Sequence, residues 1–215
     1  MTPINSWALK LLNAYLWFRF RLSFHKIHFD LNCVEDKIKI DQPVLFIANH
    51  SSWWDGLLIY ELYRRLRLKK DFRIVMLESE LQKFPFFRRC GAVGLIPKNK
   101  EHNKIILSAL KGCCVSFFPQ GQMYPQAKRP LALRPGIESL IQQLHPIQII
   151  PVALHIEPFQ QMKPTVLIKA AEPISSETPK TYKELEDLLQ KNLNDVSLGW
   201  TQQIYETQGK NPWKS

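Results

Sequence analysis

The sequence lacks the local motifs that mark several common kinds of catalytic site. It contains no Gly-x-Ser-x-Gly run, which argues against the nucleophile elbow of a serine hydrolase. Its four cysteines, Cys33, Cys90, Cys113 and Cys114, form no Cys-x2-Cys pair and have no histidine cluster with zinc spacing beside them. We therefore expect no metal and no resident cofactor, and we interpret the cysteines as small buried side chains in a reducing compartment.

A long uninterrupted apolar run is also missing. The most apolar stretch, residues 6–24, carries Lys10, Arg19 and Arg21, whereas a membrane-spanning helix needs about 20 mainly apolar residues. Ser6 is a candidate cap for this helix. The stretch is rich in side chains that settle at headgroup depth in a bilayer, namely Trp7, Tyr15, Trp17 and Phe18. We predict an interfacial helix within an N-terminal membrane-associating segment, residues 1–28, with a core-packed helix and a true span as alternatives.

Acidic residues are scarce relative to basic ones. The chain has 19 Asp and Glu against 29 Lys and Arg, which gives a formal net charge of +10 and a pI of about 9.5. Such a surplus predicts a polyanionic partner: nucleic acid, an anionic membrane, or acidic substrates such as coenzyme A esters and phospholipids. Because Trp and Phe gather in residues 6–24 instead of alternating with basic residues, we predict an anionic membrane surface. A nucleic-acid-binding domain is the weaker alternative, and we expect no nucleic acid.

The start of the chain has no basic region followed by a small-residue cleavage site, as a secretory signal would. We therefore predict a peripheral or monotopic protein on the cytoplasmic face of a membrane.

The remaining residues, 29–215, have the length and pattern of one α/β domain. Short apolar runs predict strands at residues 43–49, 72–77, 92–96, 114–118, 147–156 and 165–170. Helical patterns fall at residues 53–67, after a possible cap at Ser51 or Ser52, at 101–111 and 136–145, and from Thr178 onward. The last of these has an apolar stripe that we expect to face the core: Leu185, Leu188, Leu189, Leu193 and Val196. Strands alternating with helices predict a single α/β domain with a mixed, mainly parallel sheet flanked by helices.

The most informative string runs from Asn49 to Asp55. A buried strand ends at His50, a helix begins, and an acid follows five residues after the histidine. An Asp that accepts a hydrogen bond from one imidazole nitrogen leaves the other nitrogen free to accept a proton, which makes the histidine a general base. The spacing alone is weak, because His25 and Asp30 repeat it without a strand before or a helix after. Alternatives are a buried core histidine and an acid that serves only to cap a helix.

Four blocks of sequence resemble the glycerolipid acyltransferase family, which includes the lysophosphatidic acid acyltransferases. The blocks occur in the family's order and are Asn49-His50 through Asp55, Gly91 through Lys98 after Pro85-Phe86-Phe87, Phe118-Pro119-Gln120-Gly121, and Ile150 through Leu154. Together they span residues 49–154, about half the chain.

The resemblance implies transfer of a fatty acyl group from a thioester, acyl-coenzyme A or acyl carrier protein, to a lipid hydroxyl. His50 would deprotonate the hydroxyl, Asp55 would orient His50, and backbone amides near the helix start would stabilise the oxyanion. No metal or covalent enzyme intermediate is implied. The substrate-binding residues implied are Asn49, Lys98, Phe118, Pro119, Gln120, Gly121 and Pro151. Candidates to line an acyl groove are Trp53, Trp54, Phe86 and Phe87, with core packing as the alternative.

The third block departs from the family pattern, in which Glu-Gly-Thr-Arg follows Phe-Pro. Here Gln120 stands for the acid and Met123 for the arginine that helps to hold the acceptor's phosphate. Lys98 stands where the second block often has arginine, and Lys128, Arg129 and Arg134 follow the third block as possible phosphate ligands. The resemblance implies a lysophospholipid acceptor, and these departures leave two alternatives open: a non-phosphorylated acceptor such as a hydroxylated pigment, a sugar or an aminolipid, and a lipid-binding relative without catalysis.

Overall fold

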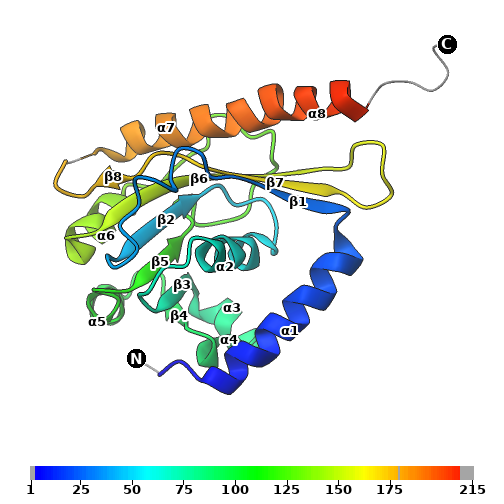
Figure 1. Ribbon diagram of the computed structural model, residues 1–215. Helices are drawn as coiled ribbons and strands as arrows, with labels where there is room; N and C mark the ends of the chain where they lie inside the picture. Colours follow the sequence, from blue (N-terminus) through cyan, green and yellow to red (C-terminus); the bar gives the residue numbers. More distant parts are fainter. Residues whose placement is uncertain (1–2, 179, 209–215) are drawn as a thin grey trace, which may run out of the picture.

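The computed structural model describes residues 3–178 and 180–208 and contains one mixed eight-stranded sheet between two layers of helices (Figure 1). The strands are β1 (Lys26–Asp30), β2 (Val44–Ala48), β3 (Phe72–Leu77), β4 (Ala92–Leu95), β5 (Cys114–Phe117), β6 (Gln148–Glu157), β7 (Thr165–Ala170) and β8 (Ile174–Ser175). The helices are α1 (Ser6–Ser23), α2 (Asp55–Arg65), α3 (Glu78–Lys83), α4 (Phe86–Arg89), α5 (Lys100–Ala109), α6 (Gly136–Leu144), α7 (Tyr182–Asn194), the π-helical turn η1 (Asp195–Trp200) and α8 (Thr201–Gln208). The predicted α/β fold is confirmed.

Five neighbouring parallel strands have their carboxyl ends at one edge of the sheet. The order is β1-β7-β6-β2-β5-β3-β4, and β8 pairs with β6. β6, β2, β5, β3 and β4 are mutually parallel, whereas β7 runs antiparallel to β6. The carboxyl ends of parallel strands share an edge, which is where ligands of α/β sheets bind. The first and third blocks therefore follow the neighbouring strands β2 and β5, the fourth lies within β6 beside the end of β2, and the second follows β4 farther along the same edge.

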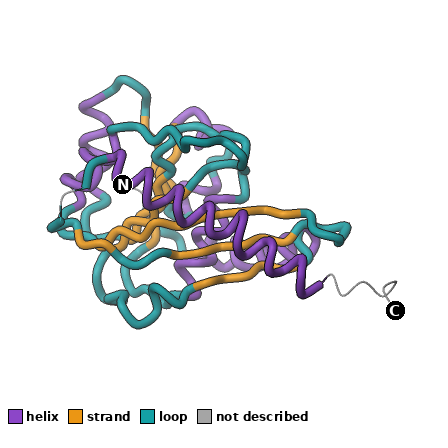
Figure 2. The backbone as a smooth tube through the Cα atoms, turned by 90° about the horizontal axis from the view of Figure 1, so that it is seen from above, coloured by secondary structure: helices purple, strands orange, loops and turns teal. Residues whose placement is uncertain are grey.

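The central strand β2 is buried on both faces, which explains its continuous apolar sequence. Phe46 faces a core cluster formed with α1 and α2, whereas Ile47 faces a second cluster formed with α5, α6, α7 and α8. Figure 1 shows α1 and α2 below the sheet and α7 and α8 above it. Viewed from above, the C-terminal helical run crosses over the strands (Figure 2).

The N-terminal segment forms one helix with apolar side chains on two faces. Ala8, Leu12 and Leu16 are buried in the core, so the core-packed alternative describes this face of α1. The opposite face presents exposed large apolar side chains: Trp7, Leu11, Tyr15, Trp17, Phe18 and Leu22. Within the described residues, no helix combines the length and apolarity required to cross a bilayer.

Several element boundaries differ from those predicted. Asn5, not Ser6, caps α1 by accepting hydrogen bonds from two backbone amides of the first turn. α2 begins at Asp55 and has no side-chain cap, because Ser51 and Ser52 bond to the Asp55 carboxylate instead. α7 begins later than predicted, with a capping box between Thr181 and Glu184. Pro179, which followed the predicted start, lies outside the described residues.

Two strands were not predicted. β1 is an edge strand of half-buried residues with polar positions, and β8 has only two residues. The boundary predicted between residues 28 and 29 falls inside β1, which pairs with β7 as part of the sheet. In the predicted C-terminal stripe, Leu185, Leu189, Leu193 and Val196 are buried, but Leu188 is 38% exposed.

Candidate active site

His50 and Asp55 form the centre of the candidate site. His50 follows β2 at the carboxyl edge of the sheet, and the turn of residues 51–54 brings Asp55 back beneath its ring. His50 Nδ1 lies 2.9 Å from Asp55 Oδ2, and the Asp55 side chain is fully buried, whereas that of His50 is 23% exposed. An acceptor at Nδ1 requires the tautomer with Nδ1–H, so Nε2 carries the lone pair. No described residue forms a hydrogen bond with Nε2.

The Asp55 carboxylate also organises the turn that precedes it. Its Oδ2 accepts backbone N–H bonds from Ser51 at 2.7 Å and Ser52 at 2.9 Å, and its Oδ1 accepts the Ser52 hydroxyl at 2.6 Å. Asp55 therefore both fixes the His50 ring and holds the turn. The sequence offered the partner of His50 and the helix cap as alternative roles for Asp55, and the structure combines them. The sequence predicts the interaction with Ser52, since an acid three residues after a serine is typical of a capping box, but the bond from Ser51 was not predicted.

The segment after β5 contacts His50 in three ways. The ring of Phe118 stacks on the imidazole with centroids 4.4 Å apart and planes at 22°. The Gln120 side-chain oxygen accepts the His50 backbone N–H at 2.7 Å, and the backbone N–H of Tyr124 donates to the His50 carbonyl at 2.9 Å. Phe118 thus touches the catalytic candidate directly. Gln120 is 1% exposed and lies behind the site, and Tyr124 was not predicted.

Asn49 uses its side chain to extend the pairing of β2 with β6. Its amide donates to the Leu154 carbonyl and accepts the Leu154 N–H, both at 2.8 Å, and the residue is 3% exposed. Gln126 repeats the pattern two residues along β6, bonding both backbone groups of Ile156. Pro151 is buried within β6 opposite Ile47. Asn49 and Pro151 are thus both buried in the fold, and Asn49 also lines the small pocket beside His50.

The second block forms β4 and the loop that follows it. Gly94 allows close packing, because a Cβ at this position would lie 2.9 Å from the Glu78 Cα and closer still to its carboxylate. Lys98 is exposed and has φ of 66° in the loop after β4. β4 lies three strands from β2, which separates their ends by roughly 14 Å. Lys98 therefore lies at the same edge of the sheet as His50, and only an extended substrate could contact both residues.

The loop of residues 119–135 carries the remaining residues of the third block. Pro119 is buried and its carbonyl accepts the Arg134 N–H at 2.9 Å, and Gly121 adopts φ of +71° against the Arg134 side chain. Arg129 donates to Asn194 at 2.9 Å and to loop carbonyls, so it holds the loop to α7. Lys128 and Arg134 remain exposed cations, and Met123 is 56% exposed.

Aromatic side chains connect the turn of residues 51–54 to α1. Trp54 packs against Phe20 of α1 and against Phe24, the C-cap of that helix, at centroid distances of 5.9 and 5.2 Å, and its ring lies 4.2 Å from that of Trp53 at a tilt of 31°. Trp53 is 53% exposed. Of the four groove candidates, Trp54 and Phe87 therefore pack mainly on the core, whereas Trp53 and Phe86 remain exposed.

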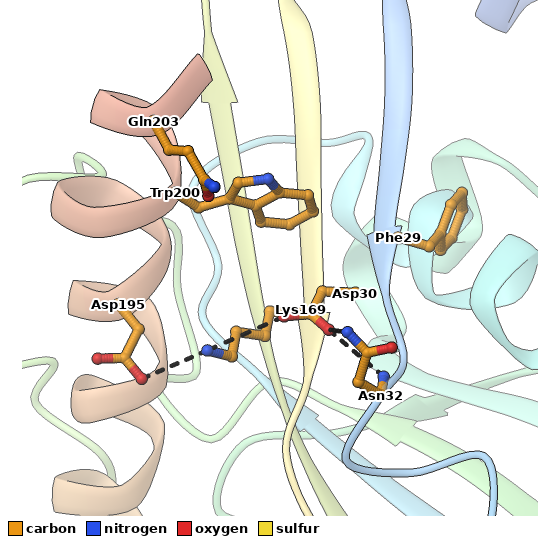
Figure 3. Close-up of a pocket in the computed structure, with 7 residues that line it drawn as sticks. All are labelled: Phe29, Asp30, Asn32, Lys169, Asp195, Trp200 and Gln203. Atoms are coloured by element: carbon orange, nitrogen blue, oxygen red, sulfur yellow. Dashed lines mark hydrogen bonds and ion pairs between the residues drawn. The ribbon is translucent and has the colours of Figure 1, made fainter. Parts of the chain in front are cut away.

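A pocket at some distance from His50 is larger than the one beside it. It has a volume of about 400 Å³ and is lined by Phe29, Asp30, Asn32, Lys169, Asp195, Trp200 and Gln203 (Figure 3). Its lysine lies 3.4 Å from Asp195 and 4.0 Å from Asp30, so its charge is engaged by two carboxylates. Lys169 pairs with Asp30 of β1 on one side and with Ala153 of β6 on the other, so the pocket is separated from the end of β2 by the strands β6 and β7. The second pocket is small and lies beside His50, between Tyr124 and Leu131.

The second histidine–aspartate pair of the sequence does not form. Asp30 accepts hydrogen bonds from the backbone and side chain of Asn32, and no bond joins it to His25 among the described residues. Five-residue spacing thus produces a pair only where a strand, a turn and a helix bring the two side chains together.

Comparisons with known proteins agree with this geometry. A model of the family described as Acyltransferase matches residues 30–155, more than half of the chain. No curated protein sequence matches. Among solved structures, the chain is similar to the crystal structure of the 1-acyl-sn-glycerophosphate (LPA) acyltransferase, PlsC, from Thermotoga maritima, with 18% identity and a TM-score of 0.59. The match covers 88% of this chain and 78% of that one, and it shows a shared fold. The chain belongs to the acyltransferase family.

Proposed function

We propose that this acyltransferase moves a fatty acyl group from an acyl thioester to the hydroxyl of a lysophospholipid-like acceptor, with His50 as general base. The observation that carries the proposal is the His50 ring, which is fixed at Nδ1 by the buried Asp55 and open at Nε2. The family match supplies the reaction class, and the structural relative acts, by its name, on 1-acyl-sn-glycerophosphate.

The proposed chemistry needs one proton to move twice. His50 Nε2 removes the proton of the acceptor hydroxyl as its oxygen attacks the thioester carbonyl, and the imidazolium is stabilised by Asp55. The tetrahedral intermediate then expels the thiolate, which receives this proton from Nε2. The Ser51 and Ser52 amides already bond Asp55, so they are not free for the oxyanion. The backbone amides of Trp53 and Trp54, which donate to no described acceptor, are our candidates.

We further propose that the exposed face of α1 lies in an anionic membrane surface. Trp7, Leu11 and Phe18 of this face are 71%, 56% and 55% exposed, and Lys10 and Arg21 flank two of its indole rings within 6 Å. Aromatic side chains and cations on one face are typical of interfacial helices. The same helix packs through Trp54 on the turn that precedes Asp55, and this contact supports a proposal in which the His50 edge of the sheet lies close to the lipid.

A second candidate acceptor has no phosphate. Met123 is exposed on the loop beside His50. In the glycerolipid acyltransferase family, which the sequence resembles, an arginine that helps to bind phosphate stands at this position. Of the three basic residues that follow, Arg129 is engaged by Asn194. These observations favour an acceptor with a neutral headgroup over a lysophosphatidic acid.

An acceptor panel distinguishes the two candidates. Palmitoyl-coenzyme A is mixed with lysophosphatidic acid, a lysophospholipid with a larger headgroup, and non-phosphorylated hydroxylated lipids, and free thiol is followed. Acceptor-dependent release identifies the acceptor class. Met123→Arg should improve lysophosphatidic acid turnover if Met123 sets the choice, and Met123→Gln serves as its neutral control. Equal release with and without every acceptor would count against acyl transfer to a lipid hydroxyl.

A further inference from the structure

Gln120 bridges two backbone groups whose donor and acceptor roles are fixed. Its Oε1 accepts the His50 N–H at 2.7 Å and its Nε2 donates to the Leu131 carbonyl at 2.7 Å. Because one partner can only donate and the other can only accept, the orientation of the amide is set by chemistry. The residue is 1% exposed, so water cannot replace either bond easily.

The bridge connects His50, which follows β2, to Leu131 on the far side of the 119–135 loop. Tyr124 holds the other backbone group of His50, and Phe118 holds its ring, so one loop restrains the residue at three points. The remaining direction is fixed by Asp55. A change at Gln120 would therefore shift the position of Nε2 while the histidine and its acid both remain present.

We propose that Gln120 is a positioning residue for His50 that must be an uncharged amide, and that the acid typical of the resembling family would impair this chain. This inference rests on the proposed role of His50 as base. A glutamate could accept from His50, but its second oxygen would face the Leu131 carbonyl, and two acceptors at 2.7 Å repel each other. Only a protonated glutamate could donate to that carbonyl.

Under this proposal Gln120 positions His50, whereas the sequence predicts that it binds substrate. Kinetic measurements distinguish these two roles. If Gln120 positions His50, Gln120→Glu and Gln120→Met should lower kcat by about 10- to 100-fold with little change in the KM for the acceptor. In Gln120→Glu, the loss of kcat should grow as pH rises, because only the protonated acid can bridge His50 and Leu131. A substrate contact would instead raise KM in both variants, without this pH trend.

Gln148 provides a matched control at the opposite edge of the sheet. It is 8% exposed at the start of β6, and its amide likewise accepts from the N–H and donates to the carbonyl of one residue, Lys39, each at 2.9 Å. In Gln148→Glu, the bridge should likewise be lost as the new acid ionises. Its free energy of unfolding, measured in urea, should therefore fall as pH rises. The variant should keep the wild-type kcat, since the bridge is remote from His50.

Two readouts keep this inference separate from the proposed function. The first is kcat in the acyl-transfer assay. The second is the backbone amide NMR signal of His50, which should move upfield in Gln120→Met when the short hydrogen bond is lost, whether or not the enzyme acts on the acceptors tested. If wild type transfers no acyl group but the signal moves, the proposed function fails and the bridge stands. If Gln120→Glu matches or exceeds wild type at high pH, or the signal is unchanged in Gln120→Met, the inference is wrong.

Discussion

Asp55 Oδ2 lies 2.9 Å from His50 Nδ1, and the same carboxylate receives three further hydrogen bonds from the turn between the two residues. The acid is fully buried, and both of its oxygens accept hydrogen bonds within the protein. This arrangement ties the orientation of the base to the local fold. Damage to the acid should therefore affect activity and stability together.

Asp55→Asn tests this link. An amide has one acceptor oxygen in place of two, and its NH2 group would face donors at Ser51 or Ser52. We expect kcat to fall by about 10²- to 10⁴-fold, since the base loses its orienting partner. We also expect the free energy of unfolding to fall by about 1–3 kcal/mol, because buried donors lose their acceptor. Urea denaturation beside initial rates checks both; an unchanged stability would show that the turn does not depend on the acid.

The outer face of α1 gives a prediction for membrane binding. The double variant Leu11→Asp with Phe18→Asp should reduce sedimentation with phosphatidylglycerol-containing vesicles about tenfold or more, because burial of each large apolar side chain contributes about 1.5–3 kcal/mol. Added salt should weaken wild-type binding, since the chain carries a net charge of +10.

Leu198→Asp with Ile105→Asp is the matched control for the α1 variant. These side chains are 69% and 67% exposed, on η1 and α5, in the layer opposite α1. The control should bind vesicles as wild type does. Equal binding by all three proteins would contradict docking through α1, and equal loss in both double variants would indicate a nonspecific charge effect.

The buried cysteines predict how the protein responds to alkaline pH. Burial raises the pKa of the Cys114 thiol to about 12 and that of Cys90 to about 11, whereas Cys33 is exposed. An unfolded thiol ionises near pH 8.5, so above that pH the unfolded chain releases protons that the folded one retains. Below about pH 8, the contribution of these thiols to the free energy of unfolding should not change with pH. Above about pH 8, the free energy of unfolding should fall as pH rises.

Thiol labelling and urea denaturation check this prediction. Near pH 8, an aromatic disulfide reagent should modify Cys33 rapidly in the folded protein, and Cys114 only after unfolding. Cys114→Ala should show a smaller loss of stability between neutral and alkaline pH than wild type does. Rapid modification of Cys114 in the folded state would refute its burial.

Much of the sheet could be predicted because its strands are buried on both faces. Each apolar run from β2 to β7 marks a strand, and the four blocks fall at the carboxyl edge that those strands define. β1 could not be found in this way, because an edge strand with half-buried polar residues has no apolar run. The two faces of α1 also could not be told apart, since Leu12 faces the core and Leu11 faces outward with equal hydrophobicity.

The roles of the two side-chain amides depend on contacts that no local pattern encodes. Asn49 bonds Leu154, which is 105 residues away, and Gln120 uses its two ends on His50 and on Leu131. From sequence, both were expected to bind substrate because they lie in the family's blocks. In the structure both side chains instead bond backbone groups, Asn49 those of Leu154 and Gln120 those of His50 and Leu131.

The most direct test of the account compares His50→Ala with His25→Ala in acceptor-dependent thiol release from palmitoyl-coenzyme A. Both histidines precede an aspartate by five residues, but only His50 contacts its acid. We predict that His50→Ala loses about 10³-fold or more of the wild-type rate and that His25→Ala retains it. Acyl transfer by His50→Ala at a rate close to that of wild type would contradict the assignment of His50 as the general base.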